Sequence, residues 1–285
     1  MKPEEPLPSV EDRAALRELV NRPVVYTVDG VDRVRVRSDL VYKTDGALEL
    51  KMDVYRPETA AAGEGLPAVL FIHGGVPPEI PVRPKEWGIF KSWGRLVAAA
   101  GMAGVTFNHR LGYPDPNLVT ASADTLDAIA FVRRGASDLG IDPERIALAA
   151  YSAGGPLLSM AIRNPEPYLK CLAAFYAYLD LTGSAVHRKY LSPEQIEWFS
   201  PAAALSQNSR PIPPIFVARA GQDRIPDLLP SVDRFVGEAI SRNAALAFFN
   251  QPGGQHGFDN QPGDPRSVEI VREAVEFLRR NLERR

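Results

Sequence analysis

The chain has a single cysteine and no long hydrophobic run. Cys171 has no partner for an internal disulfide, and its place in the apolar run CLAAFYAYL predicts a packed thiol. Nowhere do the roughly eighteen apolar residues of a membrane-spanning helix stand together. The N-terminus has acids and prolines where a signal peptide has a basic start and an apolar stretch, so we expect a cytoplasmic protein.

An excess of either charge is also missing, since 33 basic and 35 acidic side chains give a net charge of -2. No overall field is available to hold a polyanion or an anionic membrane, so we expect neither as a partner. The 285 residues, 45% of them hydrophobic and 24% charged, have the composition of an ordinary globular protein. We therefore predict one domain over residues 1–285, and the composition leaves a homo-oligomer open.

The order of apolar segments indicates the fold class. Residues 8–21 have the pattern of an amphipathic helix, and two stretches that alternate around Thr44-Asp45-Gly46 predict a hairpin. From Leu66 onward, short apolar runs without alternation are each followed by a helical stretch, as in a parallel sheet covered on both faces. The prediction is an α/β fold with a mostly parallel sheet of about eight strands, flanked by helices and antiparallel at its start.

Two segments, residues 76–88 and residues 180–209, are longer than the usual connections of such a fold. We expect both to lie above the carboxyl ends of the strands, where an open α/β sheet binds its ligands. They are predicted to contribute a small cap or lid over a pocket.

The run AAYSAGG places Ser152 between a predicted strand and a predicted helix. A serine on such a tight turn needs small residues two positions to either side, here Ala150 and Gly154. The common pattern has glycine at the first of these positions, so alanine makes the motif less specific. This context predicts a nucleophile rather than a buried serine in a plain turn.

A serine hydroxyl needs a base whose pKa is near neutrality, and the chain has four histidines. His73 and His109 end predicted strands, and His187 lies in the longer of the two segments. His256 follows the last predicted strand in a glycine-rich loop, from which an imidazole can reach the serine turn. We therefore predict that His256 is the base.

The base in turn needs a carboxylate that fixes its tautomer. Asp223 follows the preceding predicted strand, and 33 residues separate it from His256. Asp227 is the alternative, although it falls inside the next predicted helix. A serine, an acid and a histidine in the order Ser152, Asp223, His256 fit the predicted α/β fold, because each follows a different parallel strand.

Backbone N–H groups aimed at the oxyanion would stabilise the tetrahedral intermediate by several kcal/mol. Ala153, directly after the nucleophile, offers one such donor. The run His73-Gly74-Gly75 after a predicted strand offers others, because its glycines allow a sharp turn.

From residue 67 to the end, the chain resembles the hormone-sensitive-lipase-like and carboxylesterase branch of the α/β-hydrolases. The motifs that carry the resemblance are HGG at 73–75, HRLGYP at 109–114, DPERIALAAYSAGG at 142–155, AGQDRIPD at 220–227 and HGF at 256–258. It implies hydrolysis of small or medium acyl esters without metal or cofactor. It also implies the same triad and an oxyanion hole formed by Gly75, Val76 and Ala153.

Three positions depart from that branch: Val76 replaces a glycine, Tyr151 an acidic residue and His109 a tyrosine. Valine restricts the backbone more than glycine does, which makes the Val76 donor the weakest element of the site. His109 is expected to pack at a strand end. The three tryptophans can line a pocket or belong to the core: Trp87, Trp93 and Trp198.

Two other functions fit the same pattern. A peptidase of this fold would share the serine turn and the histidine. A ligand-binding protein on the same scaffold would usually have lost a triad residue, whereas all three candidates are present here. Dienelactone-type hydrolases typically use cysteine, and position 152 is serine.

Overall fold

The computed structural model describes residue 18 and residues 21–61, 63–76, 83–112 and 115–283. The helix predicted over residues 8–21 lies almost entirely outside this part of the chain. No helix within the described ranges is long and apolar enough to cross a membrane.

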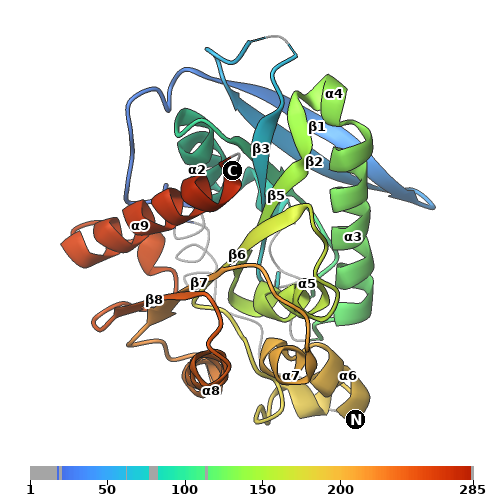
Figure 1. Cartoon of the computed structure of the whole chain (residues 1–285), viewed down its shortest axis with the longest axis vertical. Helices are drawn as coiled ribbons and strands as arrows, with labels where there is room; N and C mark the ends of the chain where they lie inside the picture. The colour runs from blue at the N-terminus through green and yellow to red at the C-terminus, as the bar shows by residue number, and fades with distance from the viewer. Residues whose placement is uncertain (1–17, 19–20, 62, 77–82, 113–114, 284–285) are drawn as a thin grey trace.

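A central sheet organises the described residues (Figure 1). Its strands are β1 (Val34–Asp45), β2 (Leu48–Pro57), β3 (Leu66–Ile72), β4 (Ala103–Phe107), β5 (Ile141–Tyr151), β6 (Leu169–Phe175), β7 (Ile215–Ala220) and β8 (Leu246–Gln251). Their spatial order is β1-β2-β4-β3-β5-β6-β7-β8. β1 pairs antiparallel with β2, and β2 antiparallel with β4, while all later pairs are parallel. The predicted eight-stranded, mostly parallel sheet with an antiparallel start is confirmed.

Helices follow most of the parallel strands. They are α2 (Gly88–Ala99), α3 (Leu118–Arg134), α4 (Ala136–Leu139), α5 (Ser159–Arg163), α6 (Pro193–Trp198), α7 (Pro201–Gln207), α8 (Leu228–Ser241) and α9 (Pro265–Leu282). Short 3₁₀ helices are η1 (Pro84–Glu86), η2 (Ser152–Leu158), η3 (His187–Lys189) and η4 (Phe258–Asn260). In Figure 1, α2 and α9 lie on one side of the sheet, and α3 and α5 lie on the other.

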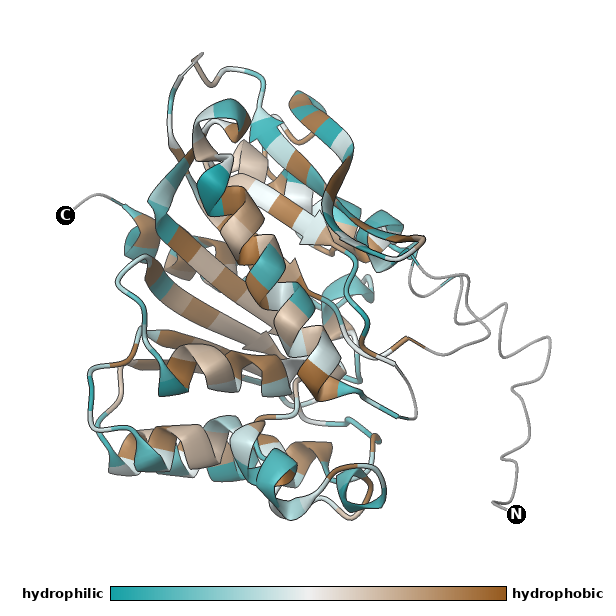
Figure 2. Cartoon of the chain, turned by 90° about the vertical axis from the view of Figure 1, so that its right-hand side faces the viewer, coloured by the Kyte–Doolittle hydropathy of each residue, from teal (hydrophilic) through white to brown (hydrophobic). Residues whose placement is uncertain are grey.

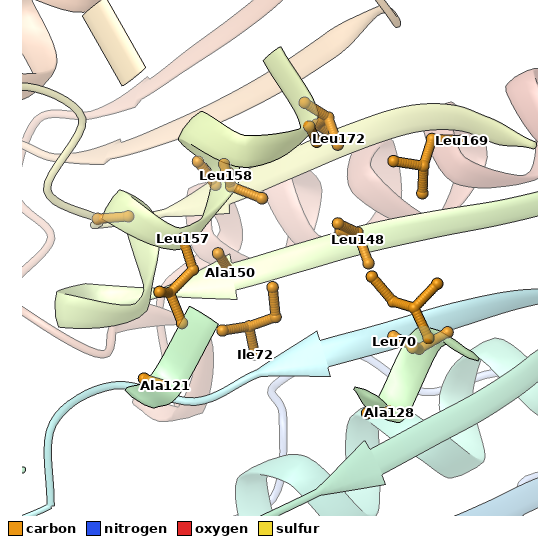
Figure 3. Packing of buried hydrophobic residues seen from close by; sticks show 14 of the residues in the cluster. Leu70, Ile72, Ala121, Ala128, Leu148, Ala150, Leu157, Leu158, Leu169 and Leu172 are labelled. Atoms are coloured by element: carbon orange, nitrogen blue, oxygen red, sulfur yellow. The ribbon is translucent and has the colours of Figure 1, made fainter. Parts of the chain in front are cut away.

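The core consists of two hydrophobic layers, one on each face of the sheet. Successive strand residues point to opposite faces, so Leu70 joins the layer of α3 and α5 while Phe71 joins the layer of α2 and α9. Figure 3 shows the first of these layers, where Leu70, Ile72 and Leu148 interdigitate with side chains of α3. Because both faces are covered, the inner strands are mostly apolar, with exceptions such as Lys170 in β6 and Arg219 in β7, and much of their ribbon is brown in Figure 2. Cys171 is fully buried in the second layer, as predicted.

Candidate active site

Ser152 occupies a strained bend directly after β5, where it is the first residue of η2. Its φ of 53° lies in the left-handed region that residues other than glycine rarely adopt. The bend packs tightly against the chain after β3, since a Cβ added to Gly154 would lie 2.5 Å from the carbonyl oxygen of His73. Ala150, on the other side of the serine, is fully buried. The close backbone approach explains the glycine at position 154, and the burial of Ala150 is consistent with a small residue there.

His256 reaches this bend from the loop after β8. Its Nε2 lies 2.9 Å from Oγ of Ser152, and its Nδ1 lies 2.7 Å from Oδ2 of Asp223. Asp223 is buried at the end of β7, and its other oxygen accepts the N–H of Ile225 at 3.0 Å. Because a carboxylate can only accept, the imidazole proton belongs on Nδ1, which leaves Nε2 able to accept the serine proton.

The other acidic candidate, Asp227, faces elsewhere. Its carboxylate accepts the hydroxyl of Ser184 at 3.1 Å and the N–H of Ala185 at 2.9 Å. The hydroxyl of Ser184 in turn lies 2.8 Å from Nδ1 of His187. Asp227 therefore fixes a turn in the segment 180–209, and Asp223 is the carboxylate that contacts His256.

His73 organises the loop that follows β3. Its Nδ1 lies 2.7 Å from the carbonyl oxygen of Gly74, and its Nε2 accepts the N–H of His109 at 3.2 Å. Burial lowers the pKa of His73 to about 4, so the ring is neutral and keeps this pair of bonds. In a trans peptide the carbonyl and the next N–H point in opposite directions, so the N–H of Gly75 is directed away from the His73 ring.

The loop also contacts the nucleophile, because a Cβ added to Gly74 would lie 2.9 Å from Cβ of Ser152. Within the described ranges, the N–H of Gly75 has no hydrogen-bond acceptor. Ala153 is the second residue of η2, and the first N–H groups of a helix have no acceptor within the helix. Both amides are thus candidates for binding an anionic oxygen beside Ser152.

The prediction for Val76 requires a correction. Its N–H donates to the carbonyl oxygen of Leu111 at 3.2 Å, as part of a short parallel bridge between Val76 and Gly112. This amide is already bonded within the protein and is not available as a third donor. The bridge forms because the loop after β4 runs alongside the loop after β3.

His109 packs beneath this loop, as expected. Its ring stacks on that of His73 with centroids 3.6 Å apart, and burial holds its pKa well below the usual range. The three tryptophans have separate places. Trp93 is fully buried, Trp87 packs partly buried against the same layer, and Trp198 is half exposed beneath the guanidinium of Arg163.

The segment 180–209 carries η3, α6 and α7, and α6 and α7 lie side by side at the lower edge of Figure 1. Asp180 anchors its start, because the buried carboxylate accepts the hydroxyls of Ser200 at 2.6 Å and Thr182 at 2.7 Å. Arg234 of α8 donates to the same carboxylate. The segment 76–88 is described only at residue 76 and from residue 83 onward.

Two residues near His256 belong to no recognisable motif, and no sequence pattern predicts their position. Tyr176 follows β6, and its ring packs edge to face against His256 with centroids 4.7 Å apart. Asp259 lies behind it and accepts the hydroxyl of Tyr176 at 2.7 Å. Nothing in the spacing of these residues indicates the contact, which joins positions 83 residues apart.

The sheet order, the serine bend and the histidine loop together define the α/β-hydrolase fold. Among the residues that the structure describes, no three His, Cys, Asp or Glu side chains group as metal ligands. The site can carry out nucleophilic chemistry with side chains alone.

Comparison with known proteins supports this class. The BD-FAE family model matches residues 52–167, less than half of the chain. Esterase LipQ of Mycobacterium tuberculosis is 25% identical over 249 residues, which are 78% of this chain and 57% of that protein. The ethyl acetate hydrolase of Pseudomonas putida is 33% identical over 126 residues, 43% of this chain and 37% of that enzyme. The alignments thus cover only part of either relative.

Solved structures show the same fold. Esterase 2 of Thermogutta terrifontis phosphoramylated by tabun superposes with a TM-score of 0.71 at 22% identity, covering 90% of this chain and 98% of that one. The propionate-bound form gives 0.69 at 22% identity, with 90% and 97% covered. These matches show that the fold of this chain is shared with that esterase.

Proposed function

We propose that the protein is a serine carboxylesterase that hydrolyses small to medium acyl esters through an acyl-enzyme. One observation carries the proposal: His256 lies between the hydroxyl of Ser152, at 2.9 Å, and the carboxylate of Asp223, at 2.7 Å. A strained serine bend, an imidazole that contacts the serine hydroxyl and a buried carboxylate that contacts the imidazole are the parts that acyl transfer needs.

In the first half of the reaction, Nε2 of His256 takes the proton of Ser152 as its Oγ bonds to the ester carbonyl carbon. The carbonyl electron pair moves onto oxygen, and the N–H groups of Gly75 and Ala153 donate to that anion. Asp223 stabilises the imidazolium that forms. The intermediate then expels the alcohol, which takes the proton from His256.

The second half repeats these steps with water. His256 removes a proton from the water as its oxygen attacks the acyl carbon, and the same amides hold the new oxyanion. Breakdown of this intermediate returns the proton to Ser152 and releases the carboxylic acid. No external oxidant, reductant or cofactor enters this sequence.

The relatives support both the reaction and a short acyl group. One is an ethyl acetate hydrolase, and the Thermogutta esterase 2 is described with propionate and with butyrate bound. That esterase is also described phosphorylated by paraoxon. We therefore propose that paraoxon and fluorophosphonates label Ser152 in this protein.

The segment 180–209 is proposed to wall the substrate pocket. It begins just beyond the carboxyl end of β6, near Tyr178, whose N–H donates to the carbonyl oxygen of Ser152 at 3.0 Å. Two anchors, the buried Asp180 and the partly buried Asp227, tie the segment to α8 and to the loop after β7. A panel of p-nitrophenyl esters from acetate to octanoate would measure the acyl length that this wall accepts.

The test of the main proposal combines turnover with covalent labelling. Ser152→Ala is expected to remove hydrolysis of p-nitrophenyl butyrate and labelling by a fluorophosphonate, with an unchanged circular dichroism spectrum. Ser159→Ala is the matched control, because Ser159 is a buried serine of α5 whose hydroxyl has no partner among the described residues. A fully active Ser152→Ala variant would rule out this nucleophile.

Failure of the wild-type protein to turn over or to be labelled would instead favour a non-catalytic binding protein. Faster cleavage of a matched anilide than of the ester would favour a peptidase. Each of these outcomes differs from the loss expected of Ser152→Ala alone.

A further inference from the structure

A buried carboxylate behind the histidine loop takes no part in the mechanism above. Asp259 is fully buried in η4, three residues after His256. Its Oδ1 accepts the hydroxyl of Tyr176 at 2.7 Å, and its Oδ2 accepts Nε1–H of Trp93 at 2.9 Å. Burying a carboxylate is costly unless its oxygens are bonded, and here each oxygen has a donor. These three residues form a polar cluster within the apolar layer of α2 and α9, and we call them the Asp259 cluster.

Tyr176 is the member of the cluster that reaches the active site. Its φ is 36°, a left-handed conformation that is a clear outlier for a bulky residue. The conformation turns the chain between two neighbours: the N–H of Tyr176 donates to Ala218 in β7 at 2.8 Å, and the N–H of Tyr178 donates to Ser152 at 3.0 Å. The strained segment that begins at Tyr176 therefore connects β7, the strand that precedes Asp223, to the bend at Ser152.

The Tyr176 ring also restricts a motion that the two hydrogen bonds of His256 permit. Those bonds hold Nδ1 and Nε2, and the imidazole can still tilt about the line through these atoms. The Tyr176 ring and the imidazole pack edge to face, with 4.7 Å between centroids and an interplanar angle of 64°. The backbone of the loop is held separately, since Gln261 donates to the carbonyl oxygen of His256 at 2.9 Å.

We infer that Tyr176 is a positioning residue for His256: Asp259 and Trp93 fix the tyrosine ring, and this ring sets the tilt of the imidazole between Ser152 and Asp223. The inference rests on the proposed esterase function. It assigns a role to a buried carboxylate and a strained backbone that packing alone leaves unexplained.

The neighbouring Tyr151 supplies a matched control. It lies in the same apolar layer, and its ring stacks on that of Phe175 at 4.9 Å. Its hydroxyl is buried and has no partner among the described residues. Tyr151→Phe therefore removes a hydroxyl from this layer without removing a hydrogen bond.

The first experiment measures kcat and KM for p-nitrophenyl butyrate, with kcat expressed per site titrated by a fluorophosphonate. This normalisation makes kcat independent of the folded fraction. Tyr176→Phe is expected to lower kcat about tenfold with KM changed less than about twofold, since a small misplacement of a catalytic group slows the chemistry. Trp93→Phe, which frees the other oxygen of Asp259, is expected to lower kcat in the same way. Tyr151→Phe is expected to keep wild-type kcat.

The second experiment observes His256 directly by ¹H NMR. The Nδ1 proton of His256, held by Asp223, is expected to give a low-field ¹H resonance, and Tyr176→Phe should shift or broaden it while Tyr151→Phe leaves it in place. This signal does not depend on turnover, so it tests the positioning role even if the wild-type protein hydrolyses no ester.

The two hypotheses fail in different ways. A wild-type protein that neither cleaves esters nor reacts with the fluorophosphonate contradicts the esterase proposal. An active wild type in which Tyr176→Phe and Tyr151→Phe have equal kcat per titrated site, with the same low-field resonance, overturns the positioning role. A Tyr176→Phe variant that lowers only the thermal unfolding midpoint overturns it as well, because Tyr176 would then be a structural residue.

Discussion

The carboxylate of Asp223 lies 2.7 Å from Nδ1 of His256, while Asp227, four residues later, bonds to a turn that begins at Ser184. The separation follows from the local backbone. Asp223 stands in the loop directly after β7, and Asp227 has a φ of 63° at the residue before α8, which turns its side chain toward the segment 180–209. Asp223 thus contacts the histidine of the candidate active site, whereas Asp227 holds the backbone of the segment 180–209.

Substitution of these two acids separates the roles. Asp223→Asn is expected to lower kcat by about three to four orders of magnitude, because an amide favours the wrong imidazole tautomer and cannot stabilise the imidazolium. Asp227→Asn is expected to keep kcat within about threefold and to lower stability instead. Kinetics with p-nitrophenyl butyrate and urea unfolding of both variants measure the difference. Equal losses of kcat would show that the carboxylate contact is not specific to Asp223.

Much of this site could be predicted because its chemistry uses residues that also shape the backbone. Gly154 lies where a Cβ would meet a carbonyl oxygen, so the serine bend requires a glycine that can be recognised in the sequence. The inner strands can also be predicted, since burial on both faces makes most of their positions apolar. The position of His256 in a glycine-rich loop after β8 follows from the order of the elements.

Other features depend on contacts that no local pattern encodes. The resemblance implies that the amide of Val76 binds the oxyanion, but the loop after β4 brings the carbonyl of Leu111 to it. The bond between Tyr176 and Asp259 likewise joins the ends of two distant segments. Such pairings are decided when the strands assemble, and no motif or periodicity in either partner indicates them.

Three buried histidines are expected to make the free energy of unfolding depend on pH: His73, His187 and His109, whose pKa burial holds well below the usual range. Burial lowers the pKa of His73 to about 4 and that of His187 to about 4, from an ordinary value of 6.5. Between pH 6.5 and about 4 the unfolded chain binds protons that the folded chain does not, so the free energy of unfolding falls as the pH is lowered through this window.

From pH 7 to pH 5 the expected loss is about 2 kcal/mol for each of these histidines, an upper figure if the folded structure relaxes. Urea unfolding at the two pH values measures it. His187→Asn keeps a donor for Ser184 and removes one titrating group, so its loss over the same interval should be smaller by about that amount. A pH-independent free energy of unfolding in the wild type would contradict the neutral burial of these rings.

Gly154 permits a direct test of the close packing at the nucleophile bend. A Cβ at this position would lie 2.5 Å from the carbonyl oxygen of His73 and 3.0 Å from that of Ile72, and both are backbone atoms that cannot move independently. Gly154→Ala is therefore expected to lower the free energy of unfolding by about 1 to 3 kcal/mol. It should also lower kcat, because the shift that relieves the contact displaces Ser152.

Gly237, within α8, is the matched control, because a Cβ there meets nothing within 4 Å. Gly237→Ala is expected to raise the free energy of unfolding by about 0.5 to 1 kcal/mol through the greater helix propensity of alanine, with kcat unchanged. Thermal unfolding and ester kinetics on both variants distinguish a steric requirement at the bend from a general response to added methyl groups. If Gly154→Ala were as stable and as active as the wild type, the backbone of His73 could not lie as close to the serine bend as the structure has it.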